Sequence, residues 1–375
     1  MSANFTSQAA RAGQAGVQTK IKVKVNGQGQ GLVSPATGGL AVPCFAGIPM
    51  LAPQPNTSSG SRTLVPPPIP IPADARDWLH GVFAGCNDRV ASTITQVPTT
   101  HEVPLDMTFI QHFLGVSAPR RFASGWTVEI RTHYLGGGRH FAPLDDWPRR
   151  WEIADIGMLV QFRQAGRLLR SKVALLQSKR LYPDEQDLEE DVPLDYMIGF
   201  HRLAHDDDDW AEVTRPRRFG FTETSRYKAL LTGNHQYDAI ASYEQQRSIP
   251  VYYLLYNPSQ IPSSAILPVT GGAPASGPAD VGCRVLPARQ IRTALASRPP
   301  GHSPAYGELR ASLSDPFGPQ HPAGWRLEHF VVALLLECET GYVAESPQDE
   351  GLYYIFNRRT GPISAAVAVT LDAPA

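Results

Sequence analysis

The sequence predicts an α/β protein built around a mixed sheet. With 375 residues, 42% of them hydrophobic, the chain can bury one large core or two ordinary ones. Between residues 100 and 256 the hydrophobic patterns follow the order helix, three strands, helix, strand. At the centre of this order, two β-like runs joined by a short polar turn predict a hairpin over Ile153 to Leu181.

The composition excludes several classes of protein. Lys and Arg total 34 against 35 Asp and Glu, so a net charge of −1 excludes a polybasic, histone-like chain. The four cysteines lie far apart and form neither a zinc-ligand spacing nor a disulfide framework. Because no apolar stretch has the length and continuity of a signal peptide or a membrane span, we expect a soluble, cytoplasmic protein with no membrane partner.

The chain is expected to have three parts. Residues 1–73 contain no Asp or Glu and are rich in Gly and Pro, which predicts a disordered leader. Residues 74–262 would form the main domain, and residues 263–375 an α+β extension that packs on the core or extends its sheet. The leader carries five basic residues, so contact with nucleic acid is an alternative to a plain unstructured segment.

Helices and strands are predicted from hydrophobic periodicity and from turn residues. Helices are expected over Ala75 to Val90, Thr100 to Leu114 with Thr100 as the cap, Pro193 to Ala204, Thr222 to Leu231, Asn234 to Gln246, Pro287 to Leu295 and Trp325 to Glu339. Strands outside the hairpin are expected over Trp126 to Tyr134, Ile249 to Tyr256, Leu352 to Asn357 and Ile363 to Leu371.

The hairpin carries polar side chains at an otherwise apolar place. Its first strand alternates so that Asp155 lies on the face opposite the apolar one, and its second strand is apolar on both faces until Gln177. With the turn near Gly166, antiparallel register pairs positions whose numbers sum to about 332. Asp155 would then face Gln177, with Cβ atoms about 4.5–5.5 Å apart, and Lys179 would project from the same face. A register slip of one residue would separate them.

Asp155, followed 22 residues later by Gln177-Ser178-Lys179 at the end of the apolar strand, resembles the motif of the PD-(D/E)XK phosphodiesterase superfamily in its QxK variant. The resemblance covers residues 100–256, and it implies the restriction-endonuclease-like core of that family, whose elements follow the same order of helix, three strands, helix and strand. It implies that Asp155 binds a divalent cation, Mg²⁺ or Mn²⁺, and that Gln177 adds an amide oxygen where the family usually has Glu or Asp. It also implies that Lys179 orients or deprotonates the attacking water and offsets charge at the scissile phosphate.

The family often adds a metal-binding acid from its first helix. Glu102, near the start of the predicted helix from Thr100, is the candidate for this catalytic and metal-binding role, with Glu129 and Glu152 as alternatives. Gln236 and Tyr243, on the helix before the last core strand, resemble a glutamine and tyrosine that some of these nucleases place beside the site. An ordinary amphipathic helix explains the same two residues equally well.

The resemblance therefore predicts a metal-dependent nuclease acting on DNA, in a defence or restriction role. Basic residues gathered between positions 149 and 218 would contact the phosphate backbone. One alternative is a catalytically inactive nucleic-acid-binding or partner-docking protein that keeps the fold. Another is that the polar residues simply mark the end of a sheet that emerges into water. RNA as the substrate, a homodimer and separate partner proteins remain open.

Overall fold

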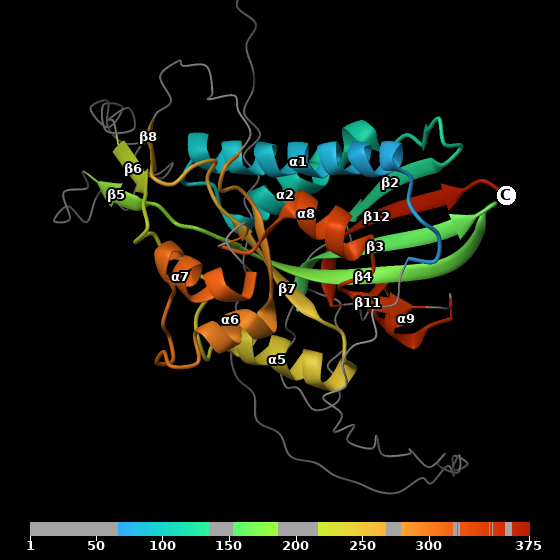
Figure 1. Cartoon of the computed structure of the whole chain (residues 1–375). Coiled ribbons are helices and arrows are strands. Elements are labelled where there is room, and N and C mark those ends of the chain that lie inside the picture. Colours follow the sequence, from blue (N-terminus) through green and yellow to red (C-terminus); the bar gives the residue numbers. More distant parts are fainter. Residues whose placement is uncertain are drawn as a thin grey trace, which may run out of the picture. The chain divides into compact units, whose positions relative to one another are not determined.

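The computed structural model describes residues 67–134, 153–186, 217–267, 279–317, 321, 323–344, 346, 348–356 and 362–375. The predicted leader up to residue 66 and the predicted helix from Pro193 to Ala204 lie outside these residues. The described part has a mixed α/β fold (Figure 1). None of its helices combines the length and the apolar character needed to cross a membrane.

The helices are α1 (Ala73–Gln96), α2 (Glu102–His112) continued by the 3₁₀ turn η1 (Phe113–Val116), α5 (His235–Arg247), α6 (Ala288–Ala294), α7 (Tyr306–Phe317), α8 (Leu327–His329) continued by the π-helical segment η4 (Phe330–Leu335), and α9 (Glu350–Phe356). The strands are β1 (Arg120–Arg121), β2 (Thr127–Tyr134), β3 (Ala154–Gln164), β4 (Arg167–Arg180), β5 (Asp184–Gln186), β6 (Arg217–Phe221), β7 (Val251–Tyr256), β8 (Ser263–Leu267), β9 (Arg284–Pro287), β10 (Trp325–Arg326), β11 (Tyr342–Ala344) and β12 (Ile363–Ala373).

Within the described residues, nine strands form one mixed sheet in the order β1-β2-β12-β3-β4-β7-β9-β10, with β11 paired to β4. β12 runs parallel to β3, and β4 runs parallel to β7, while the other pairs are antiparallel. β5, β6 and β8 form a second, small sheet. The C-terminal strand β12 is therefore internal and separates β2 from β3, whereas the sequence predicted only that this part packs on the core or extends its sheet.

The central hairpin has the predicted register. Ile156 pairs with Leu176 and Gly157 with Leu175, so that paired positions sum to 332 as far as Phe162, after which the register shifts by one. Ala165 and Gly166 join the strands with positive φ angles of 50° and 79°, which is the backbone of a two-residue type I′ turn. From Ser171 to Arg180 every residue of β4 is buried, as expected for a strand covered on both faces.

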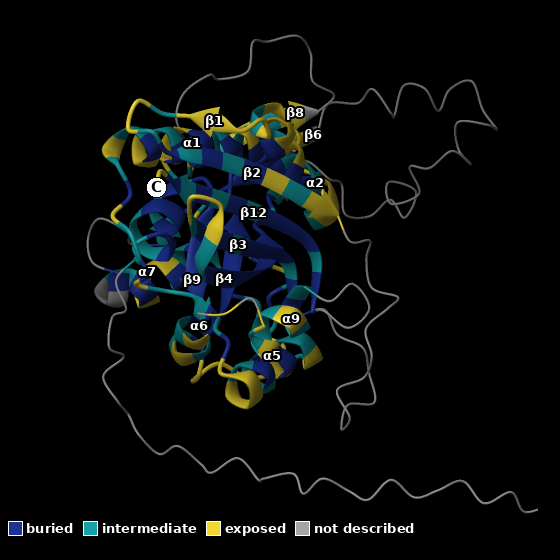
Figure 2. Ribbon diagram, turned by 90° about the vertical axis from the view of Figure 1, so that its right-hand side faces the viewer, coloured by how far each residue is buried: buried dark blue, intermediate teal, exposed yellow. Residues whose placement is uncertain are grey.

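Helices cover both faces of the main sheet. α1 and α2 lie on one face, and α5, α6 and α9 lie on the other, an arrangement visible in two perpendicular views (Figures 1 and 2). Figure 2 shows β3, β4 and β9 as mostly buried strands between these layers. The face carrying α2 is the one that matters for the candidate site.

Most predicted elements are present, with α5 capped by Asn234, whose side chain accepts the Tyr237 N–H at 2.8 Å. Two predicted elements are wrong, and in both regions a side chain bonds to the backbone. The region from Thr222 to Leu231 is a series of turns, because the Ser225 hydroxyl accepts the Thr222 N–H. The predicted strand from Leu352 is helix α9, because the Asp349 carboxylate accepts the Leu352 N–H at 2.8 Å and caps the helix.

The Thr100 cap was also predicted incorrectly. The residue before α2 is His101, and the Thr100 hydroxyl instead donates to the Val97 carbonyl at 2.7 Å. Thr100 therefore closes the turn that leads into the helix. The sequence patterns gave no indication of α7, β9 or the small sheet.

Candidate functional site

Four elements bring polar side chains together where the hairpin ends. Asp155 lies at the start of β3, and Gln177, Ser178 and Lys179 lie near the end of β4. The helix α2 covers this end of the hairpin, and β7 runs parallel to β4 beside it, with Tyr256 at its last position. The three β4 residues are almost fully buried, with exposed fractions of 2%, 1% and 4%.

Asp155 accepts several hydrogen bonds on one carboxylate oxygen. Its Oδ2 accepts the Ser178 N–H at 2.7 Å, the Ser178 hydroxyl at 2.8 Å and the Gln177 amide Nε2–H. The predicted meeting of Asp155 with Gln177 is therefore present in the structure. Among the described residues, all hydrogen bonds of this carboxylate fall on Oδ2, so Oδ1 retains its capacity to accept.

A second aspartate, Asp106, stands beside the first, although the sequence did not single it out. Its Oδ2 accepts the Ser178 hydroxyl at 3.1 Å and its Oδ1 accepts the Tyr256 hydroxyl at 2.7 Å. Burial, together with the nearby Asp155 charge, raises the pKa of Asp106 well above its ordinary value. The signal that could have found it is its place one helical turn after Glu102, on the same face of α2.

Glu102 and Lys179 also meet, as an ion pair. Lys179 Nζ lies 3.4 Å from Glu102 Oε2, and the other carboxylate oxygen of Glu102 accepts the Arg180 N–H at 3.3 Å. The lysine side chain is 5% exposed and the glutamate 22%, so the pair is largely shielded from water. Glu102 thus binds Lys179 and the backbone N–H of Arg180, whereas Asp155 binds Gln177 and Ser178.

Arg180 anchors the segment that leads into α2. Its guanidinium donates to the carbonyls of Thr100, Pro98 and Leu181, and its charged plane lies 4.3 Å from the ring centroid of Tyr182. Because Arg180 is 1% exposed, these bonds hold the start of α2 against the last residues of β4. The position of Glu102 and Asp106 therefore depends on an arginine directly after Lys179.

One buried atom at the site has no partner. Gln177 Oε1 is shielded from water and makes no hydrogen bond within the described residues, while the amide nitrogen of the same side chain is engaged with Asp155. An unpaired buried acceptor is destabilising. Two carboxylates and this amide oxygen are the hard oxygen donors that Mg²⁺ and Mn²⁺ prefer, and Mg²⁺ usually takes one or two protein carboxylates and keeps several waters. The residues present therefore fit the implied cation.

That donor set is small. In the described ranges, no group of three or more His, Cys, Asp or Glu side chains is arranged to hold a metal ion. Asp106, Asp155 and Gln177 supply two carboxylates and one amide, so most ligands of a cation here would be water and substrate oxygens.

A cavity of about 210 Å³ opens beside the two aspartates. Asp106 and Asp155 form its polar part, and its other walls are apolar apart from one serine. Val103 and Tyr134 stand at this cavity with exposed fractions of 64% and 52%. The complete lining is Val103, Asp106, Ile110, Tyr134, Asp155, Ser364 and Ala365.

Other predicted residues lie elsewhere. Glu129 is on β2 in an ion pair with Arg131 at 2.7 Å, and Glu152 lies outside the described residues. Gln236 and Tyr243 are on α5, which covers the opposite face of the sheet from α2, and the Tyr243 ring stacks on Tyr354 (Figure 1). The structure therefore does not bring these two residues to the site.

Some of the basic residues expected to contact nucleic acid are in the core. Lys172 and Arg180 have exposed fractions of 0% and 1%, because β4 is covered on both faces. These two side chains are not available to a phosphate backbone.

Comparison with protein-family models, with curated proteins and with solved structures finds no match to this chain.

Proposed function

We propose that this protein is a metal-dependent nuclease that hydrolyses DNA phosphodiester bonds, with the end of the β3-β4 hairpin as its active site. The observation that carries the proposal is the unpartnered, buried Gln177 Oε1 beside two adjacent carboxylates, Asp106 and Asp155. This combination is unfavourable as a purely structural feature, because two carboxyl groups that disfavour each other's ionisation and an unpaired acceptor share a buried place. A bound divalent cation relieves both costs.

Each residue has a role that follows from its contacts. Asp155 and Asp106 would hold the cation with Gln177 Oε1, and the Ser178 hydroxyl lies between the two carboxylates, 2.8 Å from Asp155 Oδ2 and 3.1 Å from Asp106 Oδ2. When bound, the cation supplies charge stabilisation at the phosphate and lowers the pKa of a bound water. Tyr256 fixes the second oxygen of Asp106. Together, the side chains leave the cavity side of the aspartates for substrate and water.

Lys179 supplies a positive charge close to the aspartates, because it directly follows Ser178, whose hydroxyl contacts both of them. In the structure its ammonium group is held by Glu102 at 3.4 Å. We propose that it offsets the negative charge that develops on the phosphate, as a fixed cation in a buried site does. The Glu102 contact keeps Lys179 in this place while no phosphate is bound.

The test is cleavage of a plasmid and of labelled oligonucleotides by the full chain with Mg²⁺ or Mn²⁺. Cleavage should be abolished by EDTA, and Asp155→Asn or Lys179→Ala should reduce it by roughly 100-fold or more, because each removes a charge that acts on the reacting phosphate. Asp77→Asn and Arg310→Ala are controls, since both residues are exposed and Arg310 pairs with Glu223, outside the site. Equal cleavage by the site variants and the parent would remove these residues from the mechanism.

A second candidate is a nucleic-acid-binding protein that keeps this arrangement without catalysis. The neutral Gln177 in place of an acid and the engagement of Lys179 by Glu102 favour it. The same experiment separates the two functions. Retardation of DNA in a gel without cleavage, in both the parent and Lys179→Ala, would support the binding protein and contradict the nuclease.

A further inference from the structure

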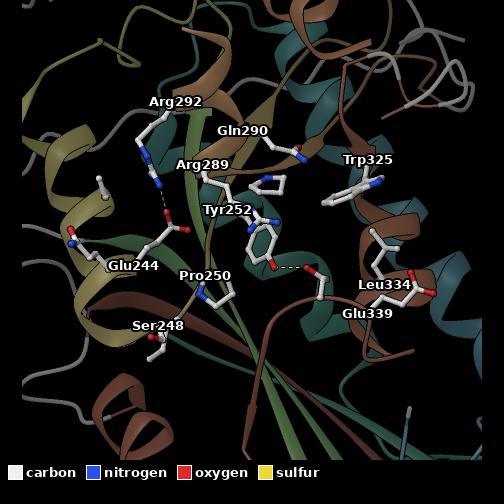
Figure 3. Close-up of a pocket in the computed structure, with 15 residues that line it drawn as sticks. Glu244, Ser248, Pro250, Tyr252, Arg289, Gln290, Arg292, Trp325, Leu334 and Glu339 are labelled. Atoms are coloured by element: carbon white, nitrogen blue, oxygen red, sulfur yellow. Dashed lines mark hydrogen bonds and ion pairs between the residues drawn. The ribbon is translucent and has the colours of Figure 1, made fainter. Parts of the chain in front are cut away.

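A second cavity, of about 610 Å³, lies between α5, α6, the start of β7 and the β10–η4 region (Figure 3). It is separate from the candidate active site. Tyr252, near the start of β7, lines this cavity, whereas Tyr256 at the end of the same strand contacts Asp106. Four residues of strand span about 13 Å. The volume is in the range of pockets that hold a small molecule the size of a cofactor.

Several polar groups in the cavity wall already form hydrogen bonds or ion pairs within the protein. Glu244 accepts the Val251 N–H at 2.9 Å with one carboxylate oxygen and pairs with Arg292 through the other (Figure 3). The Tyr252 hydroxyl accepts the Gly341 N–H at 3.0 Å and is bonded to Thr340. These bonds fix the wall, so these groups have little remaining capacity for a ligand.

Two neighbouring side chains on α6 have polar groups without a partner among the described residues. Arg289 is exposed, and its guanidinium makes no hydrogen bond or ion pair with another described residue. Gln290 has a buried Oε1 with no hydrogen-bond partner in the described part of the chain. A guanidinium recognises a phosphate or carboxylate through two parallel hydrogen bonds, and a primary amide presents a donor and an acceptor side by side.

Trp325 adds a flat apolar surface whose position is fixed by its neighbours. Its ring contacts Phe317 edge-on at 4.8 Å and lies 6.1 Å from Phe330 in a stacked arrangement, both between centroids. Trp325 and Gln290 face the same cavity (Figure 3). A rigid indole beside an amide suits a planar heteroaromatic ring that has a hydrogen-bonding edge.

The charges of the wall orient such a ligand. Arg289 and Arg292 are both on α6, and Arg292 is balanced by Glu244. Glu339 is exposed and lies across the cavity from Arg292 (Figure 3). An anionic group is therefore favoured on the α6 side, next to Gln290, and disfavoured near Glu339.

We propose that this cavity binds a purine nucleoside phosphate. The base lies against Trp325 with its donor and acceptor edge on the Gln290 amide, the pairing that glutamine makes with adenine. The phosphate is bound by Arg289. This site is independent of the proposed nuclease function, because it uses other residues and needs no metal ion.

The test is titration of the full chain with adenosine monophosphate carrying a fluorescent N-methylanthraniloyl group on the ribose, in buffer with EDTA. Competition with unlabelled adenosine monophosphate, uridine monophosphate, adenosine and inorganic phosphate then identifies which parts of the ligand are recognised. We expect saturable binding, displaced best by adenosine monophosphate. Arg289→Ala and Gln290→Leu should each weaken it by about tenfold to a hundredfold, because each removes hydrogen bonds, those of Arg289 to a charged group.

Matched controls are Arg310→Ala and Gln96→Leu, which lie outside the cavity lining. They should bind as the parent does, and Asp155→Asn should as well. Thermal unfolding of each variant confirms that it is folded. The proposal is overturned if the parent shows no saturable binding, if either pocket variant binds like the parent, if Asp155→Asn abolishes binding, or if uridine monophosphate competes as well as adenosine monophosphate.

Discussion

Gln177→Glu is a direct probe of the arrangement at the end of the hairpin. The Gln177 side chain is 2% exposed, and its amide Nε2 donates to Asp155. The substitution replaces that donor with a carboxylate oxygen, which faces a carboxylate that is already there. The change alters charge and hydrogen bonding while leaving the side-chain volume almost unchanged.

The magnitude follows from two limits. Two like charges about 4 Å apart repel by about 4 kcal/mol at an effective dielectric constant of about 20. The new carboxyl group avoids this repulsion if it takes up a proton. At pH 7 that protonation costs about 3.7 kcal/mol for an ordinary glutamate pKa of about 4.3. The protonated group then donates to Asp155 in place of the amide. We therefore expect the free energy of unfolding at pH 7 to fall by about 3–4 kcal/mol relative to the parent.

The sign of the pH dependence is a consequence of the same reasoning. The folded-state pKa of the new glutamate is raised above its unfolded value, so the folded state binds more protons and loses stability as pH rises from about 4.3 toward the folded-state pKa. The deficit should grow by at most about 1.4 kcal/mol per pH unit and nearly vanish near pH 4. Urea unfolding of both proteins between pH 4 and pH 8, in EDTA, measures it.

Magnesium ion distinguishes a metal site from a merely crowded one. A third carboxylate strengthens cation binding, so Mg²⁺ at 100 times its dissociation constant should restore about 2.7 kcal/mol to the variant, more than it adds to the parent. As a control, Gln96→Glu changes an exposed residue at the end of α1. It should change the free energy of unfolding by no more than about 0.5 kcal/mol, and its stability should depend on pH and Mg²⁺ as that of the parent does. A deficit in Gln177→Glu that is independent of pH, or an equal effect of Mg²⁺ on variant and parent, would refute the reasoning.

Three further predictions test the scaffold around the site. Gly341→Ala should lower the free energy of unfolding by at least about 2 kcal/mol in urea, because Gly341 has φ +87° and a Cβ there would lie 2.8 Å from the Val173 carbonyl oxygen. Arg180→Met should cost about 3–5 kcal/mol in the same measurement and reduce any cleavage activity, because the carbonyls before α2 lose their buried donor. Burial lowers the pKa of His112, so the parent should lose stability as pH falls below about 6.5, and His112→Gln should lose this dependence.

The central part of the fold could be predicted because its signals are local in the sequence. Alternation in β3 and the apolar run of β4 identify two strands, and the Ala165-Gly166 turn fixes their register, so that Asp155 meets Gln177. The resemblance suggested Glu102 as a metal-binding acid, whereas its ion pair with Lys179 was not predicted. That pair joins residues 77 positions apart in the chain.

The remaining features depend on contacts that no local pattern records. β12 lies between β2 and β3, yet its own alternation is compatible with any place in the sheet. The side chains of Ser225 and Asp349 accept hydrogen bonds from backbone N–H groups, of Thr222 and Leu352 respectively, and such bonds compete with the intrinsic propensity of the segment. Such interactions become visible only once the chain is folded.

Asp106 shows why the chemistry of the site was harder to predict than its backbone. An aspartate on an amphipathic helix is normally solvated, and the place of Asp106 one helical turn after Glu102 does not by itself show that it is buried. It becomes unusual through Tyr256 from β7 and Ser178 from β4, which bind its two oxygens, and through Asp155, whose charge helps raise its pKa. Arg180 in turn sets where α2 begins. The local motif therefore identifies one carboxylate, and the tertiary structure adds the second that makes a cation chemically reasonable there.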